Sequence, residues 1–365
     1  MDTVLNFKND TVRVKIGKNI VFKKDFISFC KSLKKQFVII SDSNVSPLYG
    51  KELNSALAKN NLDCLIIEIE AGEEHKTRAT KEHIENTMFE KKLGRDTCII
   101  ALGGGVICDL SAFVAATYCR GIDFITIPTT LLAMVDAAIG GKCGVNTRFG
   151  KNLLGSFYHP KAIFIDLQFL SSLPLKEKRN GLLEIIKYGI IYDKELFFTL
   201  YENSDNLDLE KLIYKSFMIK KIFVEQDEKD NNKRAALNFG HTIGHAIEVL
   251  EDFSISHGEA VAIGIIVASF ISMKLNVLEK EDFFKIFTIF KRHKFPLIFS
   301  QKVSWKALLN LLILDKKAKN KKPYFVLLEE IGKIKVFKDS YVKEVDEELL
   351  KKSLIWMQRR FASKT

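Results

Sequence analysis

The stretch TCIIALGGGVICDLSAFVAATYC at residues 97–119 contains an apolar run, a glycine turn and a helix-like segment in direct succession. Its first part, TCIIAL, is short and rich in β-branched residues, which is typical of a buried strand. The segment from Val106 to Cys119 is long enough for a helical crossover. The succession predicts a βαβ unit and therefore a mainly parallel sheet.

Strand-like and helix-like segments alternate over the remainder of the first half. This alternation is the pattern of an α/β sheet whose crossovers are helices. We expect further strands at 37–41, 64–69, 124–127 and 162–166, and further helices at about 47–59 and 80–93.

The pattern changes after about Pro174. Apolar residues now recur at spacings of three and four, as in LLEIIKYGII and HTIGHAIEVL, and β-rich runs almost disappear. One late run, YFVLL at 324–328, predicts an isolated strand. We therefore predict an α/β plus α chain, with a parallel-sheet domain at 1–175 and a mainly helical domain at 176–365.

The composition is that of a globular protein. The chain has 365 residues, of which 47% are hydrophobic and 28% charged, unlike a disordered chain. The N-terminus lacks the apolar segment of a signal peptide, and the longest uncharged stretch, 260–273, is shorter than a membrane span of about 20 residues. We expect a cytoplasmic protein with no membrane partner. Six scattered cysteines without a CxxC pair predict neither disulfides nor a thiolate metal site.

The net charge is +11, from 56 Lys and Arg against 45 Asp and Glu. Such an excess suits nucleic acids, anionic membranes or phosphorylated small molecules. The densest basic cluster, DKKAKNKK at 315–322, is interpreted as a solvated loop. Because no zinc-finger spacing or aromatic-interleaved RNA-binding signature accompanies it, no nucleic-acid partner is expected.

A glycine triplet, Gly103 to Gly105, follows the strand at 97–102. Ligands of open parallel sheets bind at the carboxyl ends of the strands, and glycines there let the backbone approach an anion at the helix N-terminus. The GxGxxG spacing is absent, so a tight turn without a ligand is the alternative.

Three of the seven histidines, His241, His245 and His257, lie close together in the sequence. The first two are four residues apart and therefore share a helix face. A catalytic Zn²⁺ commonly takes three protein ligands, and a carboxylate could join the imidazoles. The spacing alone leaves open which histidines bind. The single histidines are predicted to be surface or capping residues: His75, His83, His159 and His293.

Glu184 and Lys187 lie one helical turn apart in the apolar segment GLLEIIKYG. Charges on an apolar helix face are costly unless they are paired or bind a metal. An ordinary ion pair between the two side chains is the alternative.

Together these motifs resemble the 3-dehydroquinate synthase family of sugar-phosphate cyclases. They run in order from SDSNV at 41–45 through GEEHK, GGGVICDLSAFVAATYCRG, IPTTLLAMVDAAIGGKCGVN, GKNLLGSFYHP, LLEIIKYGII, LNFGHTIGHAIE and HGEAVAIG to YFVLLEEIG at 324–332. The resemblance implies a Rossmann-like NAD-binding domain, a helical metal-binding domain, an active site in the cleft between them, and a homodimer. The sequence departs from the family pattern at Cys108, Asp230 and Asn232.

By motif position, the resemblance implies three groups of site residues. The metal ligands would be Glu184, His241 and His257, with Zn²⁺ as the expected ion and Co²⁺ as the alternative. The NAD contacts would be Asp42, Asn44, Glu73, Glu74, His75, Lys76, Gly104, Gly105, Val106, Ile107, Cys108, Asp109, Thr129, Thr130, Lys142, Lys151, Phe169, Leu170, Ser171 and Ser172. The substrate contacts would be Asp136, Lys142, Asn152, Glu184, Lys187, Lys220, Arg234, Asn238, His245 as an acid/base or phosphate contact, Lys316 or Lys317, and Arg120 across the dimer interface.

The resemblance also implies a reaction. It is the conversion of 3-deoxy-D-arabino-heptulosonate 7-phosphate to 3-dehydroquinate and phosphate, a carbon–oxygen lyase step of the shikimate pathway for aromatic amino acids, with NAD recycled. The substrate carries a carboxylate and a phosphate, which accounts for a site rich in Lys and Arg. The alternatives are another sugar-phosphate cyclase or a metal-dependent polyol-phosphate dehydrogenase on the same scaffold.

Overall fold

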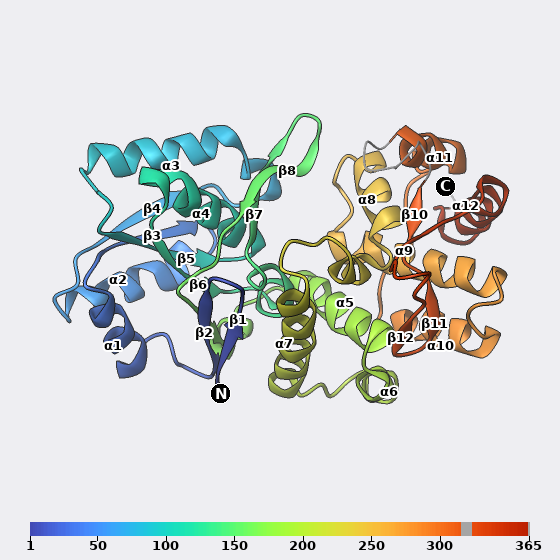
Figure 1. Cartoon of the computed structure of the whole chain (residues 1–365), viewed down its shortest axis with the longest axis horizontal. Helices are drawn as coiled ribbons and strands as arrows, with labels where there is room; N and C mark the ends of the chain where they lie inside the picture. Colours follow the sequence, from blue (N-terminus) through green and yellow to red (C-terminus); the bar gives the residue numbers. More distant parts are fainter. Residues whose placement is uncertain (315–322, 364–365) are drawn as a thin grey trace. The chain divides into compact units, whose positions relative to one another are not determined.

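The computed structural model describes residues 1–314 and 323–363 (Figure 1). The chain divides into two compact units. The first comprises Met1–Gly181 and Lys220–Glu228, and the second comprises Leu182–Ile219 and Lys229–Thr365. The basic cluster at 315–322, with Lys316 and Lys317, lies outside the described residues.

The first unit is built on a sheet that holds seven of the described strands, in the order β1-β2-β9-β6-β5-β3-β4. Only β1 and β2 pair antiparallel in it, and every other neighbouring pair is parallel. All five strands predicted for this half are present, which confirms the predicted fold class. The strands are β1 (Asp2–Asn6), β2 (Thr11–Gly17), β3 (Gln36–Asp42), β4 (Cys64–Ile69), β5 (Thr97–Gly103), β6 (Asp123–Pro128) and β9 (Ala162–Asp166).

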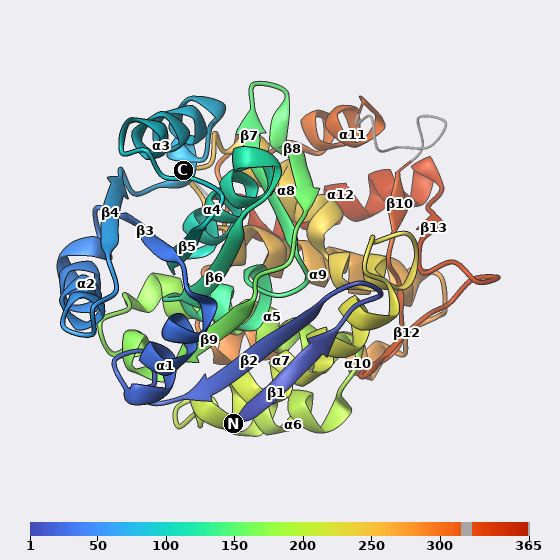
Figure 2. The same cartoon turned by 60° about the vertical axis from the view of Figure 1, so that its left-hand side comes forward.

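Helices cover both faces of this sheet. Figures 1 and 2 show α3 (Arg78–Glu90) and α4 (Gly105–Thr117) on one face, and α1 (Lys24–Leu33) and α2 (Lys51–Ala58) on the other. The face under α3 and α4 contains one apolar core, in which Val38 and Ile99 of the sheet pack with Met88 and Leu110 of the helices. Because both faces are covered, the central strands are continuous apolar runs.

Two hairpins of the first unit were not predicted. Exposed and buried residues alternate in the β1–β2 hairpin at the sheet edge. Because charged residues occupy exposed positions in these strands, neither strand contains a continuous apolar run. The second hairpin joins β7 (Lys142–Thr147) to β8 (Gly150–Phe157), whose residues are largely exposed. A Cβ at Gly155 would overlap the carbonyl oxygen of Cys143, so this pairing requires glycine.

The second unit is mainly helical, as predicted. It contains parts of α5 (Leu175–Ile191) and α7 (Leu209–Gln226), and all of α6 (Lys194–Glu202), α8 (His241–Leu250), α9 (His257–Lys274), α10 (Lys280–Arg292), α11 (Trp305–Leu314) and α12 (Glu347–Phe361). Among the described residues, α9 alone has the length and apolar composition of a membrane span, and 78% of that window is buried within the structure. This burial is that of a core helix.

The predicted isolated strand at 324–328 is wrong. The run is divided between β10 (Tyr324–Phe325), which pairs with β13 (Lys343–Glu344), and β11 (Leu328–Glu330), which pairs with β12 (Lys333–Ile334). The amide of Leu328 donates a hydrogen bond to Ser272 Oγ at 3.0 Å. The apolar run therefore forms two short paired strands, one of which is joined to α9.

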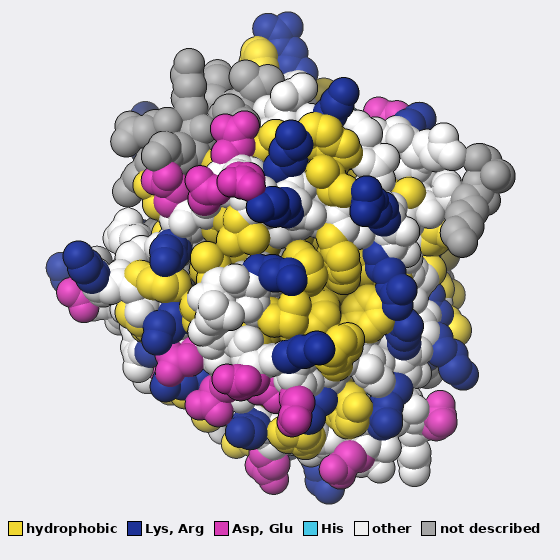
Figure 3. Space-filling view, turned by 90° about the vertical axis from the view of Figure 1, so that its right-hand side faces the viewer, with side chains coloured by type: hydrophobic (Ala, Val, Ile, Leu, Met, Phe, Trp, Pro, Cys, Tyr) yellow, Lys and Arg dark blue, Asp and Glu magenta, His cyan; other side chains and the backbone are white. Residues whose placement is uncertain are grey.

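Part of the positive charge lies on apolar surface of the second unit. Figure 3 shows Lys and Arg side chains interspersed around an apolar patch on one face of the molecule. Lys291 Nζ and Arg360 Cζ lie 4.5 and 5.3 Å from the ring centroid of Phe287. Long cationic side chains can cover apolar surface with their stems while the charge stays in water, so these cations have a packing role.

Candidate active site

Glu184, His241 and His257 form one cluster in the second unit. Glu184 lies on α5, and the two histidines are the first residues of α8 and α9. One potential ligand atom from each lies within 4.8 Å of the others. Glu184 Oε1 is 3.7 Å from Nε2 of His241 and 3.8 Å from Nε2 of His257. The cluster thus presents one carboxylate and two imidazole nitrogens to a common point.

Close packing of α8 against α9 brings the two histidines together. A Cβ at Gly264 would overlap the carbonyl oxygen of Gly240, and it would lie 2.9 Å from the amide nitrogen of Gly244. Gly240 itself has φ +81, a conformation that L side chains rarely adopt. Glycine is therefore required on both sides of this contact, and the imidazole centroids of His241 and His257 are 5.4 Å apart.

The position of His257 is also set by the N-terminus of its helix. Ser256 caps α9, and its hydroxyl accepts a hydrogen bond from the amide of Glu259 at 3.4 Å. The Glu259 carboxylate accepts one in return from the amide of Ser256 at 3.1 Å. This capping box fixes where α9 begins and hence where the His257 side chain leaves the backbone.

The donor set fits a divalent metal ion. Two histidine nitrogens and one carboxylate oxygen are common ligands of catalytic Zn²⁺, which keeps a fourth position open. Bond lengths of about 2.0–2.1 Å in a tetrahedral site separate neighbouring ligand atoms by about 3.4 Å. The separations of 3.7 and 3.8 Å are slightly wider, so a small inward movement of the side chains would complete such a site.

The pKa values of His241 and His257 are shifted in opposite directions. Burial alone would lower the pKa of His257, but the hydrogen bonds and charges of Glu184 and Glu248 outweigh burial and raise this pKa to about 9. Burial, followed by the charge of Lys187, holds the pKa of His241 well below its usual value. His241 is therefore neutral, and the carboxylates beside His257 favour a positive charge there, whether a proton or a metal ion supplies it.

His245 lies outside the Glu184 cluster. It is exposed, and its ring centroid is 5.3 Å from that of His241 and 6.0 Å from that of His257. A second group with metal-ligand spacing, His245, Glu248 and His257, shares His257 with the first. Glu184, His241 and His257 thus form one of two groups that share His257, and their choice as the metal ligands stays a prediction.

Lys187 forms the ion pair with Glu184 that their spacing suggested. Its ammonium contacts Glu184 Oε2, and the side chains are 2% and 1% exposed. Removing either partner would leave an uncompensated buried charge. The ion pair and a role at the proposed site are compatible, because Glu184 Oε1 still faces the two imidazoles.

In the first unit, three predicted ligand-binding residues form one hydrogen-bonded network, in which Lys76 is buried and Asn152 is exposed. Lys76 Nζ donates to Asp109 Oδ2 at 2.5 Å and to Asn152 Oδ1 at 2.6 Å. Burial disfavours a charge on Lys76, but the adjacent Asp109 carboxylate and then Glu73 outweigh it and raise the Lys76 pKa. Lys76 is therefore an ammonium group, and it links Asp109, another predicted NAD residue, to Asn152, a predicted substrate residue.

The glycine turn after β5 lies against the turn after β6. The amide of Thr129 donates to the carbonyl oxygen of Gly103 at 2.9 Å, and a Cβ at Gly104 would be 3.0 Å from Thr130 Cγ2. Gly104 is the N-cap residue of α4. The turn after β3 is closed by Asp42, whose Oδ1 accepts hydrogen bonds from the amides of the second and third residues after it, each at 3.0 Å. These predicted NAD residues thus follow the carboxyl ends of parallel strands, where ligands of such sheets bind.

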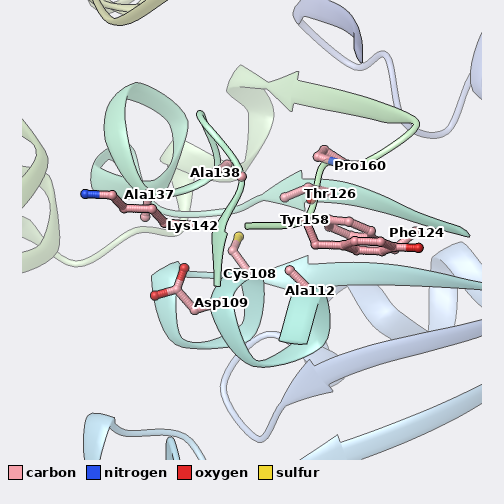
Figure 4. Close-up of a pocket in the computed structure, with 11 residues that line it drawn as sticks. Cys108, Asp109, Ala112, Phe124, Thr126, Ala137, Ala138, Lys142, Tyr158 and Pro160 are labelled. Carbon is pink, nitrogen blue, oxygen red and sulfur yellow. The ribbon is translucent and has the colours of Figure 1, made fainter. Parts of the chain in front are cut away.

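A small pocket lies beside α4, the helix that follows the glycine turn (Figure 4). Predicted NAD residues Cys108, Asp109 and Lys142 line it. The carboxylate of Asp109 and the amine of Lys142 lie on one side, and Tyr158 stacks on Phe124 on the other, with ring centroids 5.7 Å apart. Cys108, a departure from the family pattern, fits as a buried side chain of α4.

The remaining predicted residues are distributed over both units. Lys220 Nζ donates to Asp136 Oδ1 at 2.6 Å in the first unit, so these two are brought together. Arg234 is buried and Asn238 exposed within one short 3-10 segment of the second unit. Arg120 is exposed and has φ +69. The structure further describes Asn44, Glu74, His75, Gly105, Val106, Ile107, Lys151, Phe169, Leu170, Ser171 and Ser172 in the first unit.

The sequence reasoning missed Asn146 and Glu248. Asn146 Nδ2 donates to Glu73 Oε1 at 2.7 Å, and its Oδ1 accepts from the amide of Asn152 at 3.0 Å. It therefore joins the predicted NAD segment to the β7–β8 hairpin, and no spacing signalled this. The position of Glu248 could have been predicted from spacing, because it lies seven residues after His241 and hence on the same helix face.

The prediction that the single histidines are surface or capping residues is wrong for His159 and is confirmed for His293, which is the C-cap residue of α10 although it is buried. The side chain of His159 is 4% exposed; it stacks on Phe7 with centroids 3.7 Å apart, and it contacts Glu228 at 3.2 Å. His293 is buried, and its Nε2 is hydrogen-bonded to the carbonyl oxygen of Leu200 at 2.9 Å. These environments arise from residues far away in the sequence.

Comparison with known proteins identifies the family. Residues 66–180 match the profile of the 3-dehydroquinate synthase N-terminal family, and residues 181–318 match that of the 3-dehydroquinate synthase C-terminal family. Together the matches cover more than half of the chain. The chain belongs to the 3-dehydroquinate synthase family.

Curated members of the 3-dehydroquinate synthase family are similar over most of their length. The chain is 46% identical over 303 residues to 3-dehydroquinate synthase of Helicobacter pylori strain G27, covering 82% of this chain and 87% of that protein. It is 45% identical over 320 residues to 3-dehydroquinate synthase of Thermoanaerobacter pseudethanolicus, covering 86% and 88%. These similarities extend through both units.

Solved structures of related cyclases share the fold. The structure of 2-deoxy-scyllo-inosose synthase complexed with carbaglucose-6-phosphate, NAD⁺ and Co²⁺ has a TM-score of 0.87 at 25% identity, covering 97% of this chain and 99% of that chain. The structure of 2-epi-5-epi-valiolone synthase from Streptomyces hygroscopicus, with NAD⁺ and Zn²⁺ bound, has a TM-score of 0.86 at 24% identity, covering 98% and 99%. At 24% identity, the similarity to the valiolone synthase structure shows a shared fold only.

Proposed function

We propose that the protein converts 3-deoxy-D-arabino-heptulosonate 7-phosphate into 3-dehydroquinate and inorganic phosphate, with NAD recycled and a divalent metal bound. The observation that carries this proposal is the Glu184, His241 and His257 cluster, in a chain 40–46% identical to proteins named 3-dehydroquinate synthase. The enzyme would be a carbon–oxygen lyase of the shikimate pathway, in aromatic amino acid biosynthesis.

The three cluster residues would hold the metal. The ion would supply Lewis acidity to the substrate hydroxyl that is oxidised. Lys187 contacts Glu184 Oε2 and would hold that carboxylate in place beside the ion. The exposed His245 is available to move a proton or to contact phosphate. Zn²⁺ is the expected ion, and Co²⁺ also suits nitrogen and oxygen donors.

The first unit would bind NAD, which would accept a hydride from the substrate and later return it. The glycine turn leaves backbone amides of Gly104 and Gly105 at the N-terminus of α4, where a pyrophosphate binds well. The Lys76 network would set the position of Asp109 and Asn152 through its two hydrogen bonds. A solved cyclase at 25% identity contains NAD⁺, which supports the same cofactor here.

Cationic and polar side chains would bind the substrate anions. They would neutralise the carboxylate and phosphate and would orient the reacting carbon atoms. We propose these contacts for Asp136, Lys142, Asn152, Lys187, Lys220, Arg234, Asn238 and His245, with Arg120 contributed across a homodimer. The predicted location is the cytoplasm, and no nucleic-acid or membrane partner is proposed.

The test is a phosphate-release assay with 3-deoxy-D-arabino-heptulosonate 7-phosphate, Zn²⁺ and a trace of NAD⁺. The expected result is phosphate in large molar excess over NAD, without a matching increase in NADH absorbance. EDTA should stop the release, and Lys142→Ala should slow it severely. Accumulation of one NADH per substrate without phosphate would instead indicate a dehydrogenase. Release from a different sugar phosphate alone would keep the cyclase class and overturn this substrate.

A further inference from the structure

Glu248 is a buried carboxylate beside the proposed metal ligands. It lies on α8, two turns beyond His241, and is 2% exposed. Its Oε2 is 3.5 Å from Nδ1 of His257. The other ring nitrogen of His257, Nε2, is the atom that faces Glu184. One imidazole is therefore flanked by two carboxylates, one at each nitrogen.

The second proposed histidine ligand, His241, also has an acceptor beside each ring nitrogen. Nδ1 of His241 is 3.2 Å from the carbonyl oxygen of Phe239, and its Nε2 faces Glu184. An acceptor at Nδ1 holds the ring proton there, which leaves the lone pair of a neutral imidazole on Nε2. A backbone carbonyl plays this part for His241. For His257 the matching acceptor is the Glu248 carboxylate.

We propose that Glu248 is a positioning residue for the metal: its carboxylate accepts a hydrogen bond from Nδ1–H of His257 and thereby directs Nε2 of that ring toward the ion. The proposal rests on the proposed metal-dependent function and assigns a role outside the three ligands. Carboxylates behind ligating histidines fix the ring orientation and increase ligand basicity. Burial of Glu248 would strengthen this effect, because little water competes for the contact.

The competing role for Glu248 is direct ligation of a second cation with His245 and His257. That site would need Nδ1 of His257 as a ligand, so the ring would have to lose its remaining proton while Nε2 binds the first ion. His245 is exposed, whereas Glu248 is buried and already faces Nδ1. The geometry therefore favours the positioning role, and metal stoichiometry distinguishes the two.

The experiment compares Glu248→Gln and Glu248→Leu with the unchanged protein. The Zn²⁺ dissociation constant is measured by competition with a chromophoric chelator, and Co²⁺ loading is followed by its visible absorption spectrum. Loss of such a supporting carboxylate typically weakens metal binding about 10- to 100-fold. We expect that loss for leucine, a smaller loss for glutamine, which keeps a neutral acceptor, and an altered Co²⁺ spectrum for both variants.

Glu251→Gln is the matched control. Glu251 is a buried carboxylate at the end of the same helix, but its Oε1 accepts a hydrogen bond from the amide of Ser300, and it belongs to neither of the metal-ligand groups found among the described residues. Its variant should lose stability to urea while keeping the metal affinity and the Co²⁺ spectrum. A general structural effect would change both variants alike, whereas a positioning effect changes metal binding only at Glu248.

Several results would overturn the proposal. Unchanged Zn²⁺ affinity in a folded Glu248→Leu variant would overturn it. If the leucine variant fails to fold, unchanged Zn²⁺ affinity in Glu248→Gln would overturn it instead. Two ions per chain, one of them lost in both variants, would establish the second-cation site instead. The assay uses no substrate, so metal binding without phosphate release would contradict the proposed reaction while leaving the Glu248 result valid. Absence of any divalent-metal binding would overturn both.

Discussion

Substituting Gly264 by alanine tests the packing that brings the metal ligands together. The new methyl group would overlap the carbonyl oxygen of Gly240 and lie 2.9 Å from the amide nitrogen of Gly244. Both are backbone atoms, so no change of side-chain rotamer can relieve the overlap. The new methyl carbon would be 2.0 Å from the Gly240 oxygen. Comfortable contacts between such atoms are about 3.5 Å or more, so α8 and α9 must separate by up to about 1.5 Å.

The expected cost follows from opposing effects. Overpacking a close contact typically costs about 1–3 kcal/mol, and a backbone obstacle places Gly264→Ala at the upper end. Alanine is favoured over glycine inside a helix by about 1 kcal/mol, which offsets part of the cost. The net loss of unfolding free energy should be about 2 kcal/mol. Metal binding should weaken at least about 10-fold, or about 1.4 kcal/mol, because the displacement is a large fraction of a metal–nitrogen bond length of about 2.0 Å.

The assay combines urea unfolding, followed by circular dichroism, with Zn²⁺ competition. Gly105→Ala is the control, because a Cβ there meets only Ala137 Cβ at an ordinary 3.4 Å. This control should keep the metal affinity and should not lower the unfolding midpoint. If Gly264→Ala also kept both, the close approach of α8 and α9 would not be what positions His241 and His257, and the reasoning would be refuted.

Three further predictions concern the cofactor, the metal and pH. Gly104→Val should weaken NAD binding, measured by calorimetry, at least about 10-fold. The new Cβ would lie 3.0 Å from Thr130 Cγ2, and a branched side chain would occupy the space that the cofactor must approach. Unchanged affinity would place NAD elsewhere. His257→Ala should lower metal content by elemental analysis, whereas His245→Ala should keep metal and lose turnover; full zinc in the first variant would contradict the ligand assignment. Burial lowers the pKa of His293 from its usual 6.5, so the folded state favours the neutral ring. Its contribution to stability is complete above about pH 6.5 and is lost as pH falls; urea midpoints should decline less on acidification in His293→Gln, and an equal decline would refute this.

The sheet could be predicted because its physical requirements are local. Strands covered on both faces must be apolar throughout, and TCIIAL at 97–102 meets that requirement within six residues. The β1–β2 hairpin could not be predicted in the same way, because an edge pair needs only alternate residues buried. The β7–β8 hairpin depends on a close backbone approach at Gly155, which periodicity does not encode.

The environment of a single residue is less accessible to sequence reasoning than the strands are. His159 is buried by Phe7 and Glu228, which lie 152 and 69 residues away along the chain. Nothing next to His159 in the sequence signals either contact. The same limitation applies to Asn146, whose hydrogen bonds join β7 to a segment some 70 residues earlier.

The metal cluster shows where sequence spacing and packing diverge. Spacing pairs His241 with His245, because they share a helix face. Packing also brings His257 beside His241, because glycines let the first turns of α8 and α9 meet where both imidazoles reach Glu184. Helix periodicity does predict the location of Glu248, because it places Glu248 on the same helix face as His241. The same α8–α9 contact that aligns Nε2 of His257 with Glu184 therefore also aligns its Nδ1 with Glu248, so a perturbation at Gly264 should weaken both contacts together.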